Sequence, residues 1–222
     1  MSRSFEFLEP SGAGAAVARS PMESPALAAG ARMEVRDGWN VAVAYPGAAA
    51  DAPVAWADVS HLRKREVMGP HELALGTATR TNGAWWCPVT RERTLVIGGA
   101  DVDALEITTT LAALAIVGPQ ARELLARFCA LDLRAQSMPV GGFRPGSVAR
   151  TPGYVLREDS ERFLMLFGWA LGEYMWTVVA DAASGLGGAP MGLDALDREV
   201  ARALHLPPPA HVAPAPGAQG LL

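Results

Sequence analysis

The residues best able to do chemistry in this sequence are an acid, a hydroxyl and an imidazole within four positions: Asp58, Ser60 and His61. Histidine is the side chain most easily tuned near neutral pH, so one reading is a polar cluster beside a ligand pocket. The other reading, which we favour, is a structural turn in which Asp58 or Ser60 bonds nearby backbone N–H groups. A Ser-His-Asp triad is disfavoured, because triad members converge from distant segments.

The only basic run, Arg63-Lys64-Arg65, follows directly. It could bind an anionic group such as a phosphate or a polyglutamate tail. Such runs are more often solvated, and we expect a surface position.

Two adjacent tryptophans, Trp85 and Trp86, precede Cys87. Neighbours in a strand point to opposite faces, so one ring should be buried and the other should cover a pocket or a partner. We assign Trp86 to a pocket and Trp85 to an interface. Cys87 has no base at an identifiable spacing and reads as a buried thiol, although a disulfide with Cys129 stays open. The spacing of cysteines and histidines indicates no metal site.

The glycine- and aromatic-rich segment 168–176 could stack a heterocycle. We favour a sheet edge that glycines bend and aromatic rings pack. Trp169 and Tyr174 are therefore further interface candidates.

Hydrophobic periodicity indicates an α+β class with mixed or antiparallel sheets and packed helices. The turn pair Asp37-Gly38 predicts a hairpin, and Gly118-Pro119 predicts the start of a helix. The expected strands include 33–36, 39–45, 94–98, 111–117, 163–167 and 175–179, and an amphipathic helix is expected over 193–204.

Composition divides the chain into three parts. Residues 1–30 read as a flexible N-terminal arm, kept extended by Pro21 and Pro25, and residues 31–206 as one domain. Residues 207–222 read as a tail rich in proline and alanine. The net charge of −4 makes nucleic acid a poor partner. No apolar run is long enough for a membrane, and the lack of a signal peptide indicates the cytoplasm.

Three segments resemble the glycine-cleavage T-protein (aminomethyltransferase) family: Asp58 to His61, the strand 111–117 followed by Gly118-Pro119, and Arg150 to Tyr154. The resemblance implies a single folate-binding-type domain, here without the family's C-terminal barrel. It also implies a folate pocket, whose candidates are Asp58, Ser60, His61, Trp86, Arg150 and Tyr154.

The chain departs from that family where its chemistry is expected. Cys87 and Pro88 stand at the place of the essential aspartate, and Gly98 follows a strand that ends in the family near a pterin-seating asparagine. The folate glutamate has no counterpart near Leu164. We therefore assign no catalytic residue and no metal, and leave tetrahydrofolate open as a ligand.

A shortened member with a depleted folate site resembles the gamma subunits of heterotetrameric sarcosine oxidases. That resemblance implies a non-catalytic subunit whose partner subunits carry flavins and NAD. The alternatives are a stand-alone tetrahydrofolate-dependent aminomethyltransferase or methyltransferase, and a folate-binding module.

Overall fold

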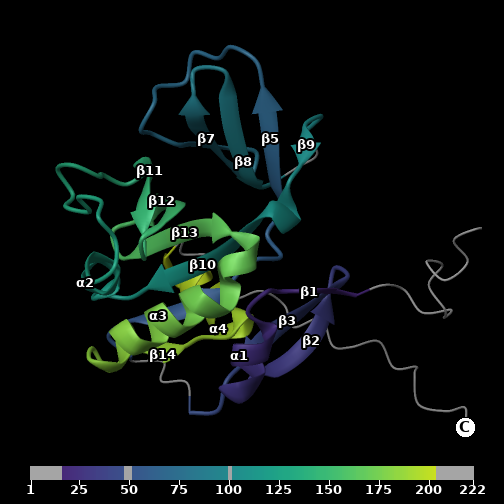
Figure 1. Cartoon of the computed structure of the whole chain (residues 1–222), viewed down its shortest axis with the longest axis vertical. Helices are drawn as coiled ribbons and strands as arrows, with labels where there is room; N and C mark the ends of the chain where they lie inside the picture. The colour runs from purple at the N-terminus through teal and green to yellow at the C-terminus, as the bar shows by residue number, and fades with distance from the viewer. Residues whose placement is uncertain (1–16, 48–51, 100–101, 204–222) are drawn as a thin grey trace, which may run out of the picture.

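The computed structural model describes residues 17–47, 52–99 and 102–203. The strands of the described residues form three sheets, which Figure 1 shows together with the helices. In chain order the elements are β1 (Ala18–Arg19), α1 (Glu23–Ala28), β2 (Arg32–Arg36), β3 (Trp39–Ala44), β4 (Ala55–Asp58), β5 (Lys64–Met68), β6 (Thr79–Thr81), β7 (Ala84–Thr90), β8 (Arg93–Gly98), β9 (Leu105–Glu106), η2 (Thr108–Thr110), β10 (Leu111–Val117), α2 (Ala121–Ala126), β11 (Phe143–Val148), β12 (Thr151–Asp159), β13 (Arg162–Gly168), η3 (Trp169–Leu171), α3 (Gly172–Ser184), β14 (Ala189–Pro190) and α4 (Leu193–Ala203).

The central sheet has the strand order β11-β12-β13-β10-β4-β14. Its strands are antiparallel except β14, which runs parallel to β4. The N-terminal sheet is β1-β3-β2, and the upper sheet, at the top of Figure 1, is β6-β7-β8-β5-β9. The mixture of sheets and helices confirms the expected α+β class.

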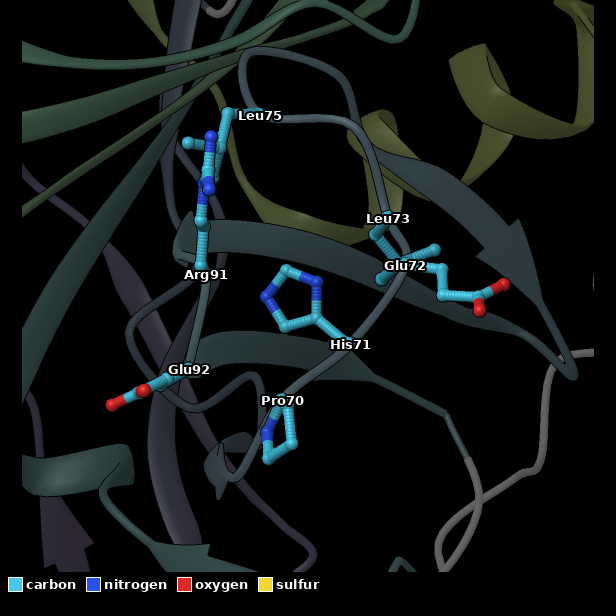
Figure 2. Close-up of a pocket in the computed structure, with 7 residues that line it drawn as sticks. All are labelled: Pro70, His71, Glu72, Leu73, Leu75, Arg91 and Glu92. Carbon is cyan, nitrogen blue, oxygen red and sulfur yellow. The ribbon is translucent and has the colours of Figure 1, made fainter.

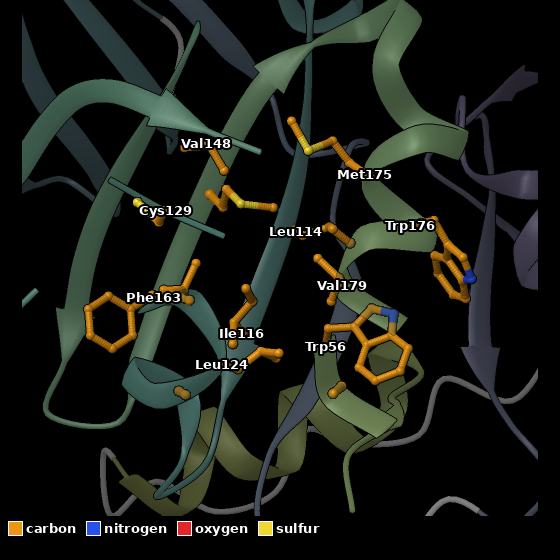
Figure 3. Close-up of a cluster of buried hydrophobic side chains, with 14 of the residues drawn as sticks. Trp56, Leu114, Ile116, Leu124, Cys129, Val148, Phe163, Met175, Trp176 and Val179 are labelled. Atoms are coloured by element: carbon orange, nitrogen blue, oxygen red, sulfur yellow. The ribbon is translucent and has the colours of Figure 1, made fainter. Parts of the chain in front are cut away.

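The central sheet is covered on both faces. The sequence of strand β10 is almost wholly apolar because its alternate side chains enter two different cores. Leu114 and Ile116 point to one core, where α1, α2 and α3 pack, together with Phe163 of β13. Figure 3 shows this core, with Trp56, Val179 and Trp176 around the strand.

The opposite face of the central sheet packs against the upper sheet, β3 and α4. Ala113 and Ala115 of β10 meet a core that includes Leu95 and Ile97 of β8 and Leu193 of α4. The upper sheet is therefore held to the body through one of its faces, and the turn that joins β4 to β5 crosses between the two sheets.

The N-terminal segment differs from the expected extended arm. The first 16 residues lie outside the described residues, as do 207–222. From Val17 onward the chain is part of the fold: Ala18–Arg19 pairs with β3, and Met22 is fully buried in the helix-covered core. Pro25 lies in the first turn of α1, where its missing N–H costs no hydrogen bond.

The expected strand over 175–179 is wrong, because these residues belong to α3. Their β-branched and aromatic side chains suggested a strand. In the structure Met175, Trp176, Val179 and Ala183 share one buried helical face against the central sheet. Packing therefore overrides local propensity in this segment.

Candidate functional site

Asp58 and Ser60 form the turn that leaves the central sheet. β4 ends at Asp58, whose Oδ1 accepts a hydrogen bond from the Ser60 backbone N–H at 2.9 Å. The Ser60 side chain is fully buried, and its Oγ accepts a hydrogen bond from the Ala113 backbone N–H at 3.1 Å. The pair therefore forms an Asx-type turn pinned to β10, which is the structural reading of these residues.

Lys64 completes this cluster and corrects the expectation of a solvated basic run. Lys64 and Arg65 are 0% and 2% exposed, and only Arg63 lies on the surface. The Lys64 Nζ donates to the carbonyl oxygens of Ser60 and Leu62, both at 2.9 Å. A buried ammonium thus holds the turn closed from inside, and no sequence signal distinguished it from its neighbours.

The charges of the cluster are perturbed by burial. Burial lowers the pKa of Lys64 to about 8, against the opposing pull of the Asp58 and Glu106 carboxylates. Burial also raises the pKa of Asp58, although hydrogen bonds from Ser20 and Ser60 oppose that rise. Buried titratable groups with shifted pKa values are typical of functional sites and of structural ion networks.

His61 belongs to the same turn, and charged groups of both the turn and the β2–β3 hairpin act on it. Burial lowers its pKa to about 4, with further lowering by the charge of Lys64, while Asp37 acts in the opposite direction. The imidazole is therefore neutral at neutral pH, and it can accept or donate a hydrogen bond but carries no charge.

The polar side chains of this cluster are engaged in hydrogen bonds within the fold. Asp58, Ser60 and Lys64 bond to one another or to the backbone around the turn. Among the residues that the structure describes, no group of three or more histidine, cysteine or acidic side chains could hold a metal ion.

Trp85 joins the upper sheet to the central sheet. Its Nε1 donates to the Glu158 Oε1 of β12 at 2.9 Å, and the Arg80 guanidinium lies 5.8 Å from its ring centroid. Trp86 is half-buried and pairs with Val96 of β8. Cys87 is fully buried, and burial together with the nearby Glu158 raises the pKa of its thiol. Cys87 and Cys129 are both free and buried.

The other two pocket candidates lie apart from the turn. Tyr154 of β12 stacks on Phe143, with ring centroids 5.5 Å apart and planes 8° from parallel. Arg150 is exposed in the two-residue loop between β11 and β12. The structure thus brings Asp58, Ser60 and His61 together and places Trp86, Tyr154 and Arg150 on other elements.

The remaining interface candidates lie in η3 and in the first turn of α3, so the segment after Gly168 is helical and is not the expected sheet edge. Trp169 is half-buried and meets Trp39 edge to face, at a centroid distance of 6.0 Å. Tyr174 is 46% exposed, and its hydroxyl donates to the Ala149 carbonyl oxygen at 3.0 Å. Of these two rings, Tyr174 offers the more open surface.

An open cavity of about 640 Å³ lies at the far end of the upper sheet, between the segment after β5 and the β7–β8 turn. Figure 2 shows the His71 ring in its middle, with Glu72 and Glu92 directed away on either side. The His71 Nε2 lies 2.7 Å from the Thr90 carbonyl oxygen and so donates to it, which leaves Nδ1 as a buried acceptor with no partner among the described residues. The length of β5 separates this cavity from Lys64, roughly 13 Å at about 3.3 Å per residue.

Comparison with known proteins identifies the fold. No family model matches the sequence, and no curated protein matches it. Among solved structures, a chain of the heterotetrameric sarcosine oxidase from Corynebacterium sp. U-96, in complex with pyrrole 2-carboxylate, superposes with a TM-score of 0.61 at 16% identity. That match covers 76% of this chain and 96% of the oxidase chain.

A second match is the glycine cleavage system aminomethyltransferase T from Bartonella henselae, with a TM-score of 0.64 at 16% identity. It covers 82% of this chain and 61% of the aminomethyltransferase, so this chain spans about three fifths of that protein. The two matches confirm the expected T-protein-like fold. Within the described ranges, no helix combines the length and apolar character that a membrane crossing requires.

Proposed function

We propose that this chain is a non-catalytic, gamma-like subunit of a heterotetrameric sarcosine oxidase complex in the cytoplasm. In such a complex sarcosine is oxidatively demethylated and the one-carbon unit passes to tetrahydrofolate, with flavins and NAD on partner subunits. The observation that carries the proposal is the closed turn at Asp58, Ser60 and Lys64, whose polar groups bond each other and the backbone.

Two further observations support a structural role. The position where the family resemblance places the essential carboxylate holds Cys87, which is fully buried with a raised thiol pKa. A thiol in that state is a poor nucleophile and cannot replace a carboxylate as a base. The fold match also spans 96% of a chain from a heterotetrameric oxidase.

Co-expression tests this proposal. The full chain is produced with the other subunits of a heterotetrameric sarcosine oxidase and analysed by size-exclusion chromatography with light scattering. We expect co-elution in one complex, and oxidase activity only in the presence of the partner subunits. A lone monomer in the presence of all partners would contradict the proposal.

The alternative is a stand-alone tetrahydrofolate-dependent aminomethyltransferase or methyltransferase, or a folate-binding module. This alternative would be favoured over the oxidase-subunit proposal if the isolated chain bound tetrahydrofolate at micromolar concentration by calorimetry and if Asp58→Asn abolished that binding. Asp181→Asn is the matched control, because it makes the same change at an exposed α3 residue that is not a pocket candidate.

A further inference from the structure

A second cavity, about 460 Å³ in volume, lies at the β11–β12 side of the central sheet, and strands β13 and β10 separate that side from β4 and the Asp58 turn. It is bounded by the end of α2 and the segment after it, by the β11–β12 hairpin and by one face of α3. Its lining comprises Ala126, Arg127, Phe128, Cys129, Ala130, Ser147, Ala149, Arg150, Tyr174 and Val178. The volume falls within the range of sites that hold small ligands or a few residues of a partner.

The lining is cationic, although the whole chain carries a net charge of −4. Arg127 and Arg150 line the cavity and no carboxylate does. Several arginines elsewhere pair with acids, for example Arg134 with Asp132 at 2.6 Å and Arg162 with Glu158 at 3.3 Å. Within the described parts of the chain, neither cavity arginine has an acidic partner.

Arg127 is positioned from within the fold. Its Nη1 donates to the Ala182 carbonyl oxygen near the end of α3, at 2.8 Å. The rest of its guanidinium keeps donors for a second acceptor, since guanidinium has five N–H groups. A planar guanidinium fixed by one bond loses less freedom when it binds a carboxylate through the others.

Arg150 is held in a strained backbone conformation. The hairpin loop Ala149-Arg150 has φ values of +48° and +64°, a left-handed pair for which Asn-Gly is the usual sequence. A side chain in this conformation crowds the following carbonyl oxygen, so each of the two residues is strained relative to a right-handed conformation. Strain of this kind persists only where surrounding contacts impose it, and it concentrates at functional sites.

Contacts around the hairpin impose that conformation. The Ala149 N–H donates to the Phe128 carbonyl oxygen at 2.8 Å, and its carbonyl accepts the Tyr174 hydroxyl at 3.0 Å. The cavity's aromatic wall and its strained hairpin are therefore one bonded unit. This unit presents two guanidinium groups beside the partly exposed rings of Phe128 and Tyr174.

We propose that this cavity docks an acidic segment of a partner polypeptide, in which an Asp or Glu lies next to an aromatic or aliphatic residue. The carboxylate would pair with Arg127 and Arg150, and the apolar side chain would lie on Phe128, Tyr174 and Val178. Charge complementarity selects this occupant, because a neutral or basic segment would leave both guanidinium groups unpaired. The identity of the partner as an oxidase subunit rests on the proposed function.

Charge reversal in the co-expressed complex tests the docking. The double variant Arg127→Glu/Arg150→Glu should weaken the binding of the partner subunits at least roughly tenfold, because the introduced carboxylates repel an acidic segment. The matched control is Arg122→Glu, on an exposed α2 residue outside the cavity lining. Unchanged affinity in the double variant with a native circular dichroism spectrum would overturn the proposal.

Photo-crosslinking identifies the occupant. Ala126, exposed at the rim, is replaced by p-benzoylphenylalanine and the irradiated complex is analysed by mass spectrometry. We expect crosslinks to a partner peptide that contains Asp or Glu beside an apolar residue, and crosslinks only to neutral or basic peptides would overturn the proposal. If the wild-type chain forms no complex, the proposed function fails; if it assembles but both tests fail, only the docking site fails.

Discussion

At the scale of single residues, the Asp58–Lys64 turn shows how burial decides what a polar side chain can do. Lys64 is charged at neutral pH with a pKa of only about 8, and both hydrogen bonds of its Nζ go to backbone carbonyls of its own turn. A charged group is costly to bury unless its donors are satisfied, and here the turn supplies the acceptors. The same bonds that stabilise the ammonium fix the crossing between two sheets.

The depressed pKa of Lys64 makes the stability of the protein depend on pH. The folded state releases the Lys64 proton near pH 8, whereas the unfolded chain keeps it until about pH 10.5. Between these values the unfolded state binds more protons, so the contribution of Lys64 to the free energy of unfolding rises with pH, by about 3 kcal/mol in all. We expect the wild type to gain this amount relative to Lys64→Met when urea unfolding is followed from pH 8 to 10.5.

The comparison with Lys64→Met cancels the tyrosines and thiols that titrate in the same range. Parallel stability curves for the two proteins would show that Lys64 has an ordinary pKa. At pH 7 the variant should be less stable by about 1–3 kcal/mol, because two carbonyl oxygens lose their donor.

Cys87 should be chemically inert in the native state. It is fully buried with a raised thiol pKa, and thiolates rather than thiols react with disulfide reagents. We expect Ellman's reagent to modify Cys87 in a Cys129→Ser background only at the rate of unfolding, which rises with urea concentration. Rapid labelling that is independent of urea would contradict the burial of this thiol, and the Cys87→Ser/Cys129→Ser variant sets the blank.

At the scale of secondary structure, two segments adopt conformations that their local sequence does not predict. Helix α3 buries Met175, Trp176 and Val179, which favour strands when taken alone. The β11–β12 hairpin closes with Ala149-Arg150, although neither residue favours positive φ. In both segments the surrounding fold imposes a conformation that the residues alone would not select.

Relief of the hairpin strain should stabilise the protein. Arg150 is exposed at φ +64°, a conformation that glycine adopts at no steric cost. We expect Arg150→Gly to raise the free energy of unfolding by about 1 kcal/mol and Arg150→Ala to leave it nearly unchanged, because alanine keeps the strain. Chemical denaturation of the three proteins at one pH measures the difference, and equal stabilities of the glycine and alanine variants would refute it.

At the scale of the whole molecule, the central sheet is an inner layer with cores on both faces. Its helix-covered core is closed partly by the segment 17–30, whose Met22 is 0% exposed. This segment therefore contributes to the stability of the fold, and a deletion meant to test the N-terminal arm has to leave residues 17–30 in place.

Truncation tests that assignment. Removal of residues 1–30 should prevent stable folding, because it strips β1, α1 and Met22 from the core. Met22→Ala is the milder change and should cost about 2–5 kcal/mol. A 1–30 deletion that unfolds with wild-type stability would contradict the burial of Met22.

Much of the fold is legible in the sequence, because periodicity and turn chemistry are local. The hairpin at Asp37-Gly38, the strand 111–117 and the helix after Gly118-Pro119 all follow from such signals. The clustering of Asp58 and Ser60 was also predictable from their spacing. The burial of Lys64 was not, because it depends on carbonyl groups that the turn brings around it and on a sheet crossing that no short pattern encodes.

The contact between Trp56 and Trp176 can form only late in the synthesis of the chain. The two rings meet edge to face, 5.9 Å apart, on segments about 120 residues apart in the chain. At translation rates of about 5–20 residues per second, Trp56 leaves the ribosome roughly 6–24 s before its neighbour. β10 emerges about halfway through that interval and β14 only after Trp176, so throughout the interval the nascent chain leaves one or both edges of the apolar strand β4 unpaired and open to chaperones.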